Sequence, residues 1–255
     1  MPTASRRTRL WPYLRLAAAA LGLAAIIRQL SIVMVNGSAA DTEWAAHLPT
    51  LISNFFSYFT ILSNIIAAVA LIIGAVWALR NRTSEATEPA WLATLFLCAS
   101  TYMIVTGIVY NLLLRHIPIA GIMDVWTNET LHVVIPLVML ADVLFAPRRR
   151  ALAWSSILVA AIFPIVWAVY TLIRANFITG PATGEPWWYP YPFLDPNLDG
   201  ASYLTVAGYI VAIAAAIIGV AALVVWIGRW RGIRSADPTT SPSHPSPATV
   251  SPDQR

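Results

Sequence analysis

The amino-acid sequence predicts an all-α, polytopic membrane protein built as a bundle of six transmembrane helices. Three observations predict this fold. Hydrophobic residues make up 58% of the 255 residues and charged residues only 11%, whereas soluble domains carry about 25% charged residues. Six apolar stretches are long enough to cross the roughly 30 Å hydrocarbon core, which takes about 20 helical residues. All 16 basic residues are arginines, and most of them cluster at the ends of these stretches.

The apolar stretches run near residues 13–35, 55–79, 91–114, 130–146, 151–173 and 201–227. The run Arg6-Arg7-Thr8-Arg9 before an alanine-rich segment is also typical of a cleaved signal. However, Arg28 interrupts the apolar segment and five further stretches follow, so we interpret the segment as a retained first helix.

The chain therefore divides into three parts. Residues 1–12 form a cytoplasmic N-terminus and residues 13–230 a six-helix transmembrane domain. Residues 231–255, rich in Pro, Ser and Thr, form a disordered cytoplasmic tail, because they lack apolar periodicity.

The arginines predict the orientation of the bundle. They cluster before the first stretch, after the second, between the fourth and fifth, and after the sixth: Arg6, Arg7, Arg9 and Arg15; Arg80 and Arg82; Arg148, Arg149 and Arg150; Arg229, Arg231 and Arg234. The other connections hold only Arg115 and Arg174 beside several acidic residues. Cytoplasmic loops carry an excess of basic residues. Strict alternation then places both termini in the cytoplasm and the acidic loops outside.

Polar side chains are expected in the outer half of this bundle. On the second helix, Asn54, Ser57, Thr60 and Asn64 follow spacings of three, three and four and so share one face. Thr60 is expected about five residues, or roughly 8 Å, below the outer end of its helix. His132 is expected one turn below the outer end of the fourth helix. Other helices add polar residues at similar depth: Arg28, Thr106, Tyr110, Asn111, Tyr170 and Arg174.

The fourth helix carries the strongest candidate for chemistry. Asn128, His132 and Pro136 are spaced by four and share a face. Pro136 has no amide proton, so the carbonyl of His132 loses its helical partner, and the resulting kink is expected to open a polar cavity. An ionisable group inside a bilayer is costly and is a functional candidate by default. By contrast, Asp142 is expected to form an ion pair with the arginines at 148–150.

Thr60 and His132 could together form a nucleophile and its base. A hydroxyl is a weak nucleophile until a base takes its proton, and histidine is the usual base. Residues at suitable depth to stabilise an oxyanion are Tyr110, Asn111, Asn64 and Arg28, and residues that could orient the imidazole are Asn128, Glu129 and Asp195. The alternatives are structural: a threonine often bonds back to its own helix, and Ser57 and Asn64 can join helices. Arg28 and Arg174 can extend to the headgroups, or Arg28 can pair internally with Glu129 or Asp195.

Three segments resemble a known family. Residues 58–64 (Tyr-Phe-Thr-Ile-Leu-Ser-Asn), residues 128–136 (Asn-Glu-Thr-Leu-His-Val-Val-Ile-Pro) and residues 188–195 (Trp-Tyr-Pro-Tyr-Pro-Phe-Leu-Asp) resemble, in order, motifs of the androgen-induced and androgen-dependent membrane hydrolases. The resemblance implies a six-helix enzyme that cleaves fatty acid esters of hydroxy fatty acids, with Thr60 as nucleophile and His132 as base. The arginine-only, alanine-rich composition suggests a bacterial relative in the plasma membrane. The expected partners are membrane lipids and a lipid or fatty acyl ester, without a cofactor or nucleic acid.

Two other functions remain open from the residues alone. An outer pocket with Arg28 and Arg174 could hold an anionic or lipid-like solute in a small transporter or binding protein, although the inner half offers no polar path and no inverted repeat is evident. A metalloenzyme would use His47, His116 and His132 with nearby acids, but their spacing matches no ligand motif. The loop before the last helix, with its Trp, Tyr and Pro residues, is expected to lie on the outer rim as a lid or belt.

Overall fold

A computed structural model of the chain describes residues 6–83, 86–118 and 121–236, and within these residues every regular element is a helix. Six helices are long and apolar enough to cross a membrane, as the sequence predicts. The first is α1 (Arg6–Ser38) and the second is α4 (Phe59–Arg80). The third combines α5 (Ala90–Val109) with the π-helical segment η1 (Tyr110–Leu114).

The fourth candidate span consists of three consecutive segments: α6 (Val125–Glu129), the π-helical η2 (Thr130–Val134) and α7 (Ile135–Phe145). The fifth is α8 (Ser156–Ala175) and the sixth is α9 (Tyr203–Ala236).

Three short helices lie in the connections between the long ones. These are α2 (Glu43–Ala46) and α3 (Leu48–Phe55) before α4, and the 3₁₀ turn η3 (Pro192–Leu194) before α9.

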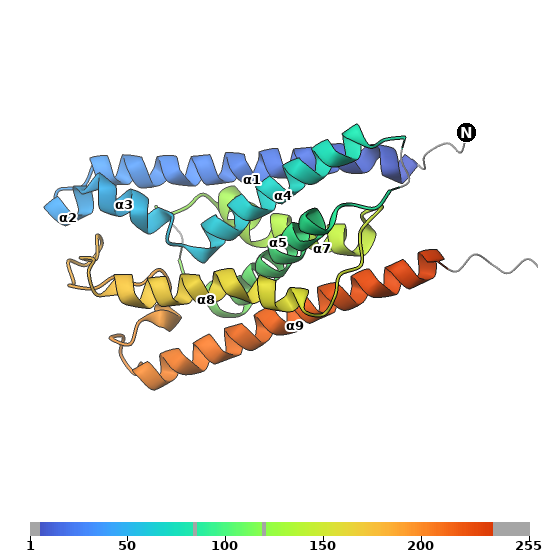
Figure 1. Cartoon of the computed structure of the whole chain (residues 1–255). Helices are drawn as coiled ribbons and strands as arrows, with labels where there is room; N and C mark the ends of the chain where they lie inside the picture. Colours follow the sequence, from blue (N-terminus) through green and yellow to red (C-terminus); the bar gives the residue numbers. More distant parts are fainter. Residues whose placement is uncertain (1–5, 84–85, 119–120, 237–255) are drawn as a thin grey trace, which may run out of the picture.

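The long helices lie side by side and alternate in direction (Figure 1). The start of α1 and the ends of α4 and α9 lie together at the right of Figure 1, whereas α2, α3 and η3 lie at the left. Arginines join helices at the right end: Arg82 donates to the Tyr13 hydroxyl, Arg148 to the Asn81 carbonyl, and Arg229 to the Leu152 carbonyl. We call this the arginine-rich end. The clustering at one end is the arrangement that the alternating arginines predict.

The second candidate span begins later than the sequence analysis predicts. The chain turns at Phe56–Tyr58, where the Ser57 amide donates to the Asn54 carbonyl, and α4 starts at Phe59. Asn54 therefore belongs to α3 and Ser57 to the turn, so the predicted polar face on one helix is wrong for these two residues. Thr60 is the second residue of α4 and lies at its end, not five residues below it.

The ends of the chain differ from the predicted division in two places. Helix α1 already begins at Arg6, inside the segment assigned as the N-terminus, and α9 continues to Ala236, beyond the boundary predicted at residue 230. Both extensions contain apolar residues among the arginines, namely Leu10 and Trp11 in α1 and Ile233 in α9. The remaining tail prediction, for residues 237–255, lies outside the described residues.

The core is centred on α4 and α5, which are the most buried of the six long helices, while α8 and α9 are the most exposed. Alanines let α1 approach this core closely: Ala18 and Ala19 pack in one cluster with Leu71 on α4 and Phe96 on α5. Gly74 on α4 continues this close packing. A Cβ atom at Gly74 would lie 2.5 Å from the Phe96 ring and 2.9 Å from a guanidinium nitrogen of Arg15.

Gly74→Ala is therefore expected to destabilise the protein by about 1–3 kcal/mol, because an added methyl group in a packed core forces strain. The measurement is the thermal unfolding midpoint of the detergent-purified protein. Gly219→Ala is the matched control, since Gly219 is also on a candidate span and a Cβ there has no neighbour within 4 Å. Equal midpoints for the two variants would contradict the prediction.

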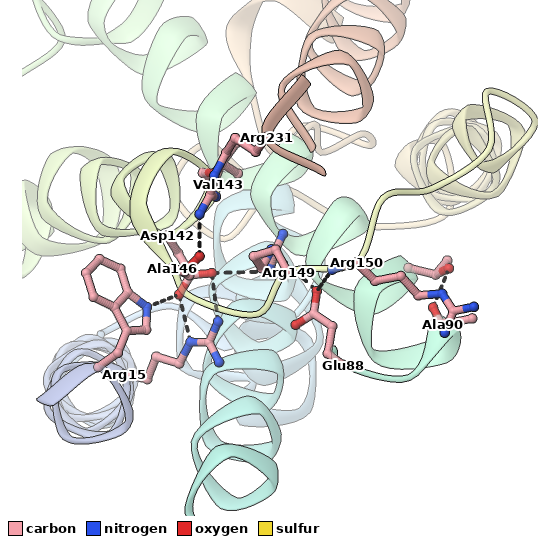
Figure 2. A network of polar contacts seen from close by, with 11 residues as sticks. Arg15, Glu88, Ala90, Asp142, Val143, Ala146, Arg149, Arg150 and Arg231 are labelled. Carbon is pink, nitrogen blue, oxygen red and sulfur yellow. Dashed lines mark hydrogen bonds and ion pairs between the residues drawn. The ribbon is translucent and has the colours of Figure 1, made fainter. Parts of the chain in front are cut away.

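A buried network of charges joins α1 and α7 to the connections before α5 and α8 at the arginine-rich end (Figure 2). Asp142 accepts two hydrogen bonds from the Arg15 guanidinium, at 2.7 and 3.0 Å, and one from the Trp11 ring nitrogen at 2.8 Å. Arg149 lies 3.2 Å from Asp142 and 3.4 Å from Glu88. The expected pairing of Asp142 with the 148–150 arginines is thus confirmed for Arg149, whereas Arg15 is its closer partner and was not predicted.

The two arginines of this network also contact an aromatic ring. The guanidinium groups of Arg15 and Arg149 lie 4.4 and 4.5 Å from the centre of the Phe96 ring, a favourable cation–π geometry. Burial raises the pKa of the Glu88 carboxyl, while the neighbouring Arg149 and Arg15 oppose that shift. Two guanidinium groups and two carboxylates therefore compensate each other inside the protein.

Candidate functional site

Thr60 and His132 contact each other, as the sequence analysis predicts. The Thr60 hydroxyl oxygen lies 3.3 Å from Nε2 of His132, and both residues are buried, with 7% and 8% of their surface exposed. Nδ1 of His132 lies 2.9 Å from the backbone carbonyl of Asn128. Since a carbonyl only accepts, Nδ1 carries the proton and the lone pair of Nε2 faces Thr60. The hydroxyl of Thr60 therefore donates to Nε2.

The local helix geometry explains how His132 is held. The amide of Ile135 donates to the carbonyl of Thr130, five residues earlier, which defines the π-helical segment η2. Pro136 follows directly and cannot donate to the His132 carbonyl. The predicted distortion at this proline is therefore a π-helical segment, a feature often found at functional sites. Gly107 on α5 packs against it, since a Cβ there would lie 3.0 Å from Pro136 and 3.4 Å from the His132 carbonyl oxygen.

Tyr110 fixes the plane of the imidazole. Its ring stacks on His132 with centroids 4.2 Å apart and an angle of 20° between the planes. The Asn128 side-chain amide donates to the Tyr110 hydroxyl over 2.5 Å. Asn128 thus acts twice, through its backbone on His132 and through its side chain on Tyr110. Of the three residues expected to orient the imidazole, Asn128 is the one that contacts it, and Tyr110 contributes a stacked ring instead of facing the Thr60 hydroxyl.

Tyr191 contacts Thr60 and was not among the site residues that the sequence analysis predicted. Its hydroxyl accepts a hydrogen bond from the Thr60 amide at 3.1 Å and lies 3.2 Å from the Thr60 hydroxyl. An amide in the first turn of a helix has no intrahelical acceptor, so Tyr191 takes that place. Burial raises the pKa of the Tyr191 hydroxyl, which keeps it neutral. Because Thr60 donates to His132, the proton of Tyr191 points to the Thr60 hydroxyl.

The segment around Tyr191 covers the start of α4. Tyr191 and Leu194 are buried against Val206 of α9 and pack with Trp167 of α8. The segment therefore lies over the end of the bundle opposite the arginine-rich end, as a lid or belt would. The quoted Tyr-Pro-Tyr-Pro run marked the segment, but neither its spacing nor its hydropathy indicated which tyrosine faces Thr60.

An apolar cleft of about 120 Å³ begins at Thr60. It lies between α4, α5, α8, η3 and α9, and its lining includes Phe59, Val105, Pro164, Phe193 and Ile213. Pro136 does not line this cleft, so the cleft is not the polar cavity expected beside the kink; of the predicted pocket residues, Thr60, Thr106 and Tyr110 line the cleft. The polar side chains beside the cleft hydrogen-bond to one another, so apolar side chains form most of its lining.

Asn64 joins helices, as one interpretation of the sequence proposes. Its side-chain nitrogen donates to the Thr60 carbonyl at 2.8 Å and to the Leu131 carbonyl at 3.2 Å, which ties α4 to η2. Thr106 makes a similar link, because its hydroxyl lies 3.2 Å from that of Ser63. Both residues thus lie beside the Thr60–His132 pair and support its position.

Four of the predicted pocket residues make their polar contacts away from Thr60 and His132. Arg28 pairs with Asp124 at 2.7 Å, so both predicted partners, Glu129 and Asp195, are wrong. Glu129 instead pairs with Arg115 at 2.8 Å. The remaining two bond locally: Asn111 donates to the Gly107 carbonyl, and Asp195 accepts from the Asn197 amide.

A separate set of polar contacts connects α3 to α8. The Ser57 hydroxyl lies 3.3 Å from that of Tyr170, and Arg174 donates to the Ser53 hydroxyl and the Asn54 side chain, both at 2.7 Å. Arg28 and Arg174, which the transporter alternative places in one pocket, are thus bound to different protein groups.

Among residues 6–83, 86–118 and 121–236, no three His, Cys, Asp or Glu side chains gather closely enough to hold a metal ion. No protein-family model, curated protein or solved structure matches the chain.

Proposed function

We propose that this protein is an integral membrane ester hydrolase of the bacterial plasma membrane, with both termini cytoplasmic. Its substrates are lipid or fatty acyl esters, including fatty acid esters of hydroxy fatty acids. Thr60 is the nucleophile and His132 the general base. The observation that carries the proposal is the chain of contacts from the Asn128 carbonyl through the His132 ring to the Thr60 hydroxyl. Such a chain is the arrangement that activates a weak hydroxyl nucleophile.

The reaction proceeds in two halves. The Thr60 oxygen attacks the ester carbonyl while its proton passes to Nε2 of His132, and the tetrahedral intermediate then expels the alcohol, which takes the proton from His132. The acyl group is now bonded to Thr60. A water molecule gives a proton to His132 and attacks this acyl ester, and collapse of the second intermediate releases the carboxylic acid and returns the proton to Thr60.

Two hydrogen-bond donors support the negative charge that develops on the carbonyl oxygen. The hydroxyl of Tyr191 and the amide of Thr60 lie beside the reacting oxygen and are 3.1 Å apart. When a substrate carbonyl enters, the Tyr191 hydroxyl can turn its proton from the Thr60 oxygen to the oxyanion, and this movement also leaves the Thr60 amide proton available to the oxyanion. Donors placed in advance in a buried site stabilise such charge strongly.

Tyr191→Phe is expected to lower kcat by about 10²-fold, because one oxyanion donor is lost. The aromatic ring remains, so packing against Val206 is preserved and KM should change little. Steady-state kinetics with the purified variant measure this. Tyr209→Phe is a suitable control, since Tyr209 is part of the same aromatic group through Phe193 but has no contact with Thr60. A Tyr191→Phe enzyme with wild-type kcat would exclude Tyr191 from this role.

The apolar lining of the cleft favours an acyl chain as the part of the substrate that the protein binds. The cleft starts at the nucleophile and continues between α8 and α9, the two most exposed of the long helices. On α8, Ile165 lines the cleft and is 61% exposed, so the cleft reaches the surface that lipid would cover. An acyl chain entering from the membrane would thus place its ester next to Thr60.

The proposal is tested by assaying detergent-purified wild-type protein on a series of monomeric acyl esters from acetyl to octanoyl. Each buried methylene contributes about 0.8 kcal/mol, so kcat/KM should rise by up to about fourfold per methylene until the cleft is full. A preparation carrying Thr60→Val supplies the background rate. Absence of hydrolysis above that background across short, long and hydroxy-acid esters would refute the proposal.

A further inference from the structure

The cleft at Thr60 opens sideways between α8 and α9. Two of its lining residues are exposed, Ile165 on α8 and Ala214 on α9, whereas its other lining residues are buried or half-buried. Ile165 lies ten residues before the last residue of α8, and Ala214 lies eleven residues after the first residue of α9. At about 1.5 Å per residue, the opening is roughly 15 Å from these helix ends, which is half of a hydrocarbon core of about 30 Å.

Aromatic rings cover the site toward the same helix ends. Tyr191 packs edge-to-face against Tyr58 with ring centres 5.5 Å apart, and Tyr58 packs in the same way against Trp188 at 5.7 Å. Arg174 lies 5.5 Å from the centre of the Trp188 ring and donates to Asn54, so it joins the covering segment to α8 and α3. The nucleophile is therefore covered on the side that faces bulk water, while the cleft leads from it to the lateral opening.

The lining of this route suits an uncharged lipid. The cleft is lined by residues of the described part of the chain, and none of them is charged. Its hydroxyl groups are hydrogen-bonded to other protein groups, namely those of Thr60, Thr106, Tyr110 and Tyr191. Burying a charge costs far more than burying an alcohol hydroxyl, and a buried water needs about two to four polar partners. An uncharged alcohol dissolved in the membrane therefore reaches this site more readily than water does.

We infer that the protein also transfers acyl groups to uncharged, membrane-soluble alcohols, such as long-chain primary alcohols and diacylglycerols. This transacylase activity rests on the proposed acyl-enzyme at Thr60. The acceptor hydroxyl gives its proton to Nε2 of His132 while its oxygen bonds to the acyl carbon. Collapse of the tetrahedral intermediate breaks the bond between the acyl carbon and the Thr60 oxygen, which takes the proton back from His132. One ester is consumed and another is formed, so the step needs no further reactant.

The test uses the full-length protein in vesicles of ether-linked phosphatidylcholine, which offers no ester bond, with p-nitrophenyl octanoate as the acyl donor. Decanol and ethanol are supplied in separate reactions at equal total concentration, and mass spectrometry measures octanoic acid and the new octanoate ester. The ratio of transfer to hydrolysis should be at least about tenfold higher with decanol than with ethanol, which is the gain from about two buried methylenes. Protein-free vesicles supply the background of both products.

Variants at the lateral opening test the route of the acceptor. Ala214→Trp should lower the decanol ratio by about tenfold, because the indole fills the opening and removes this preference. Ala212→Trp is the matched control, since Ala212 is also exposed on α9 but does not line the cleft, and it should keep the wild-type ratio. Ile165→Trp repeats the test from α8, with the exposed, non-lining Val166→Trp as its control. Both products come from the same acyl-enzyme, so their ratio does not depend on how much of a preparation is folded.

The products separate this inference from the proposed hydrolase. Octanoic acid without decyl octanoate overturns the inference and leaves the hydrolase in place. Neither product above background overturns both. Equal ratios with decanol and ethanol, or equal ratios in Ala214→Trp and Ala212→Trp, mean that the acceptor does not enter through the opening, and they also overturn the inference.

Discussion

Thr60→Val is expected to reduce ester hydrolysis to the rate of a protein-free control in the same detergent. Valine keeps the shape of threonine but has no hydroxyl, so no acyl group can be transferred to residue 60. His132→Ala should lower kcat by about 10²- to 10⁴-fold, the usual contribution of a general base. Steady-state rates with the best ester of the acyl series measure both effects. Intact-mass spectra after a brief incubation should show the acyl adduct on the wild type and none on Thr60→Val.

Matched controls separate chemistry from folding in this experiment. Thr171→Val makes the same substitution at another buried threonine, which lies on α8 and does not line the cleft, and it should keep wild-type kcat. His116→Ala removes an exposed histidine and should also be silent. Thr60→Ser should retain part of the activity because it restores the hydroxyl. If Thr60→Val and Thr171→Val have the same rate as the wild type, Thr60 is not the nucleophile.

The fold could be predicted largely from hydropathy and arginine placement. A helix is the way to satisfy backbone polar groups inside lipid, so long apolar stretches determine the number of helices. The interruption at Phe56–Tyr58 could not be predicted, because Phe55, Phe56 and Phe59 read as one apolar run. A turn that is closed by backbone hydrogen bonds alone leaves no mark in hydropathy.

The candidate site could be predicted in part. The contact between Thr60 and His132 was predicted from their similar depth in the bundle and from the resembling segments. Thr60 nevertheless lies nearer the end of its helix than expected. Tyr191 was missed because it reaches Thr60 from a connection, and loop packing has no periodicity. The Arg28 partner was misassigned for a similar reason: Asp124 is placed by the loop before α6, where helix geometry gives no guidance. At this site, the contact between two helical residues, Thr60 and His132, was thus predictable, and the contacts made by Tyr191 and Asp124 from connections were not.

The largest stability effect is expected from Asp142→Asn. Asparagine has nearly the same shape, but it leaves the Arg15 guanidinium, whose side chain is only 5% exposed, without its closest counter-charge. Removing one member of a buried ion pair costs about 3–5 kcal/mol. The unfolding midpoint of the detergent-purified protein should therefore fall by roughly 10 °C. Asp124→Asn is the control, since it breaks the half-exposed Arg28 pair, which is worth about 0–1 kcal/mol.

Removing both charges together distinguishes a charge penalty from a loss of packing. In an Arg15→Met, Asp142→Leu double variant, Arg149 still has Glu88 as its partner, and no buried charge is left alone. Well-packed apolar replacements of a buried ion pair are often neutral or stabilising, so the double variant should be more stable than Asp142→Asn. If it is equally unstable, the hydrogen bonds of Asp142, including the one from Trp11, outweigh its charge in joining α1 to α7.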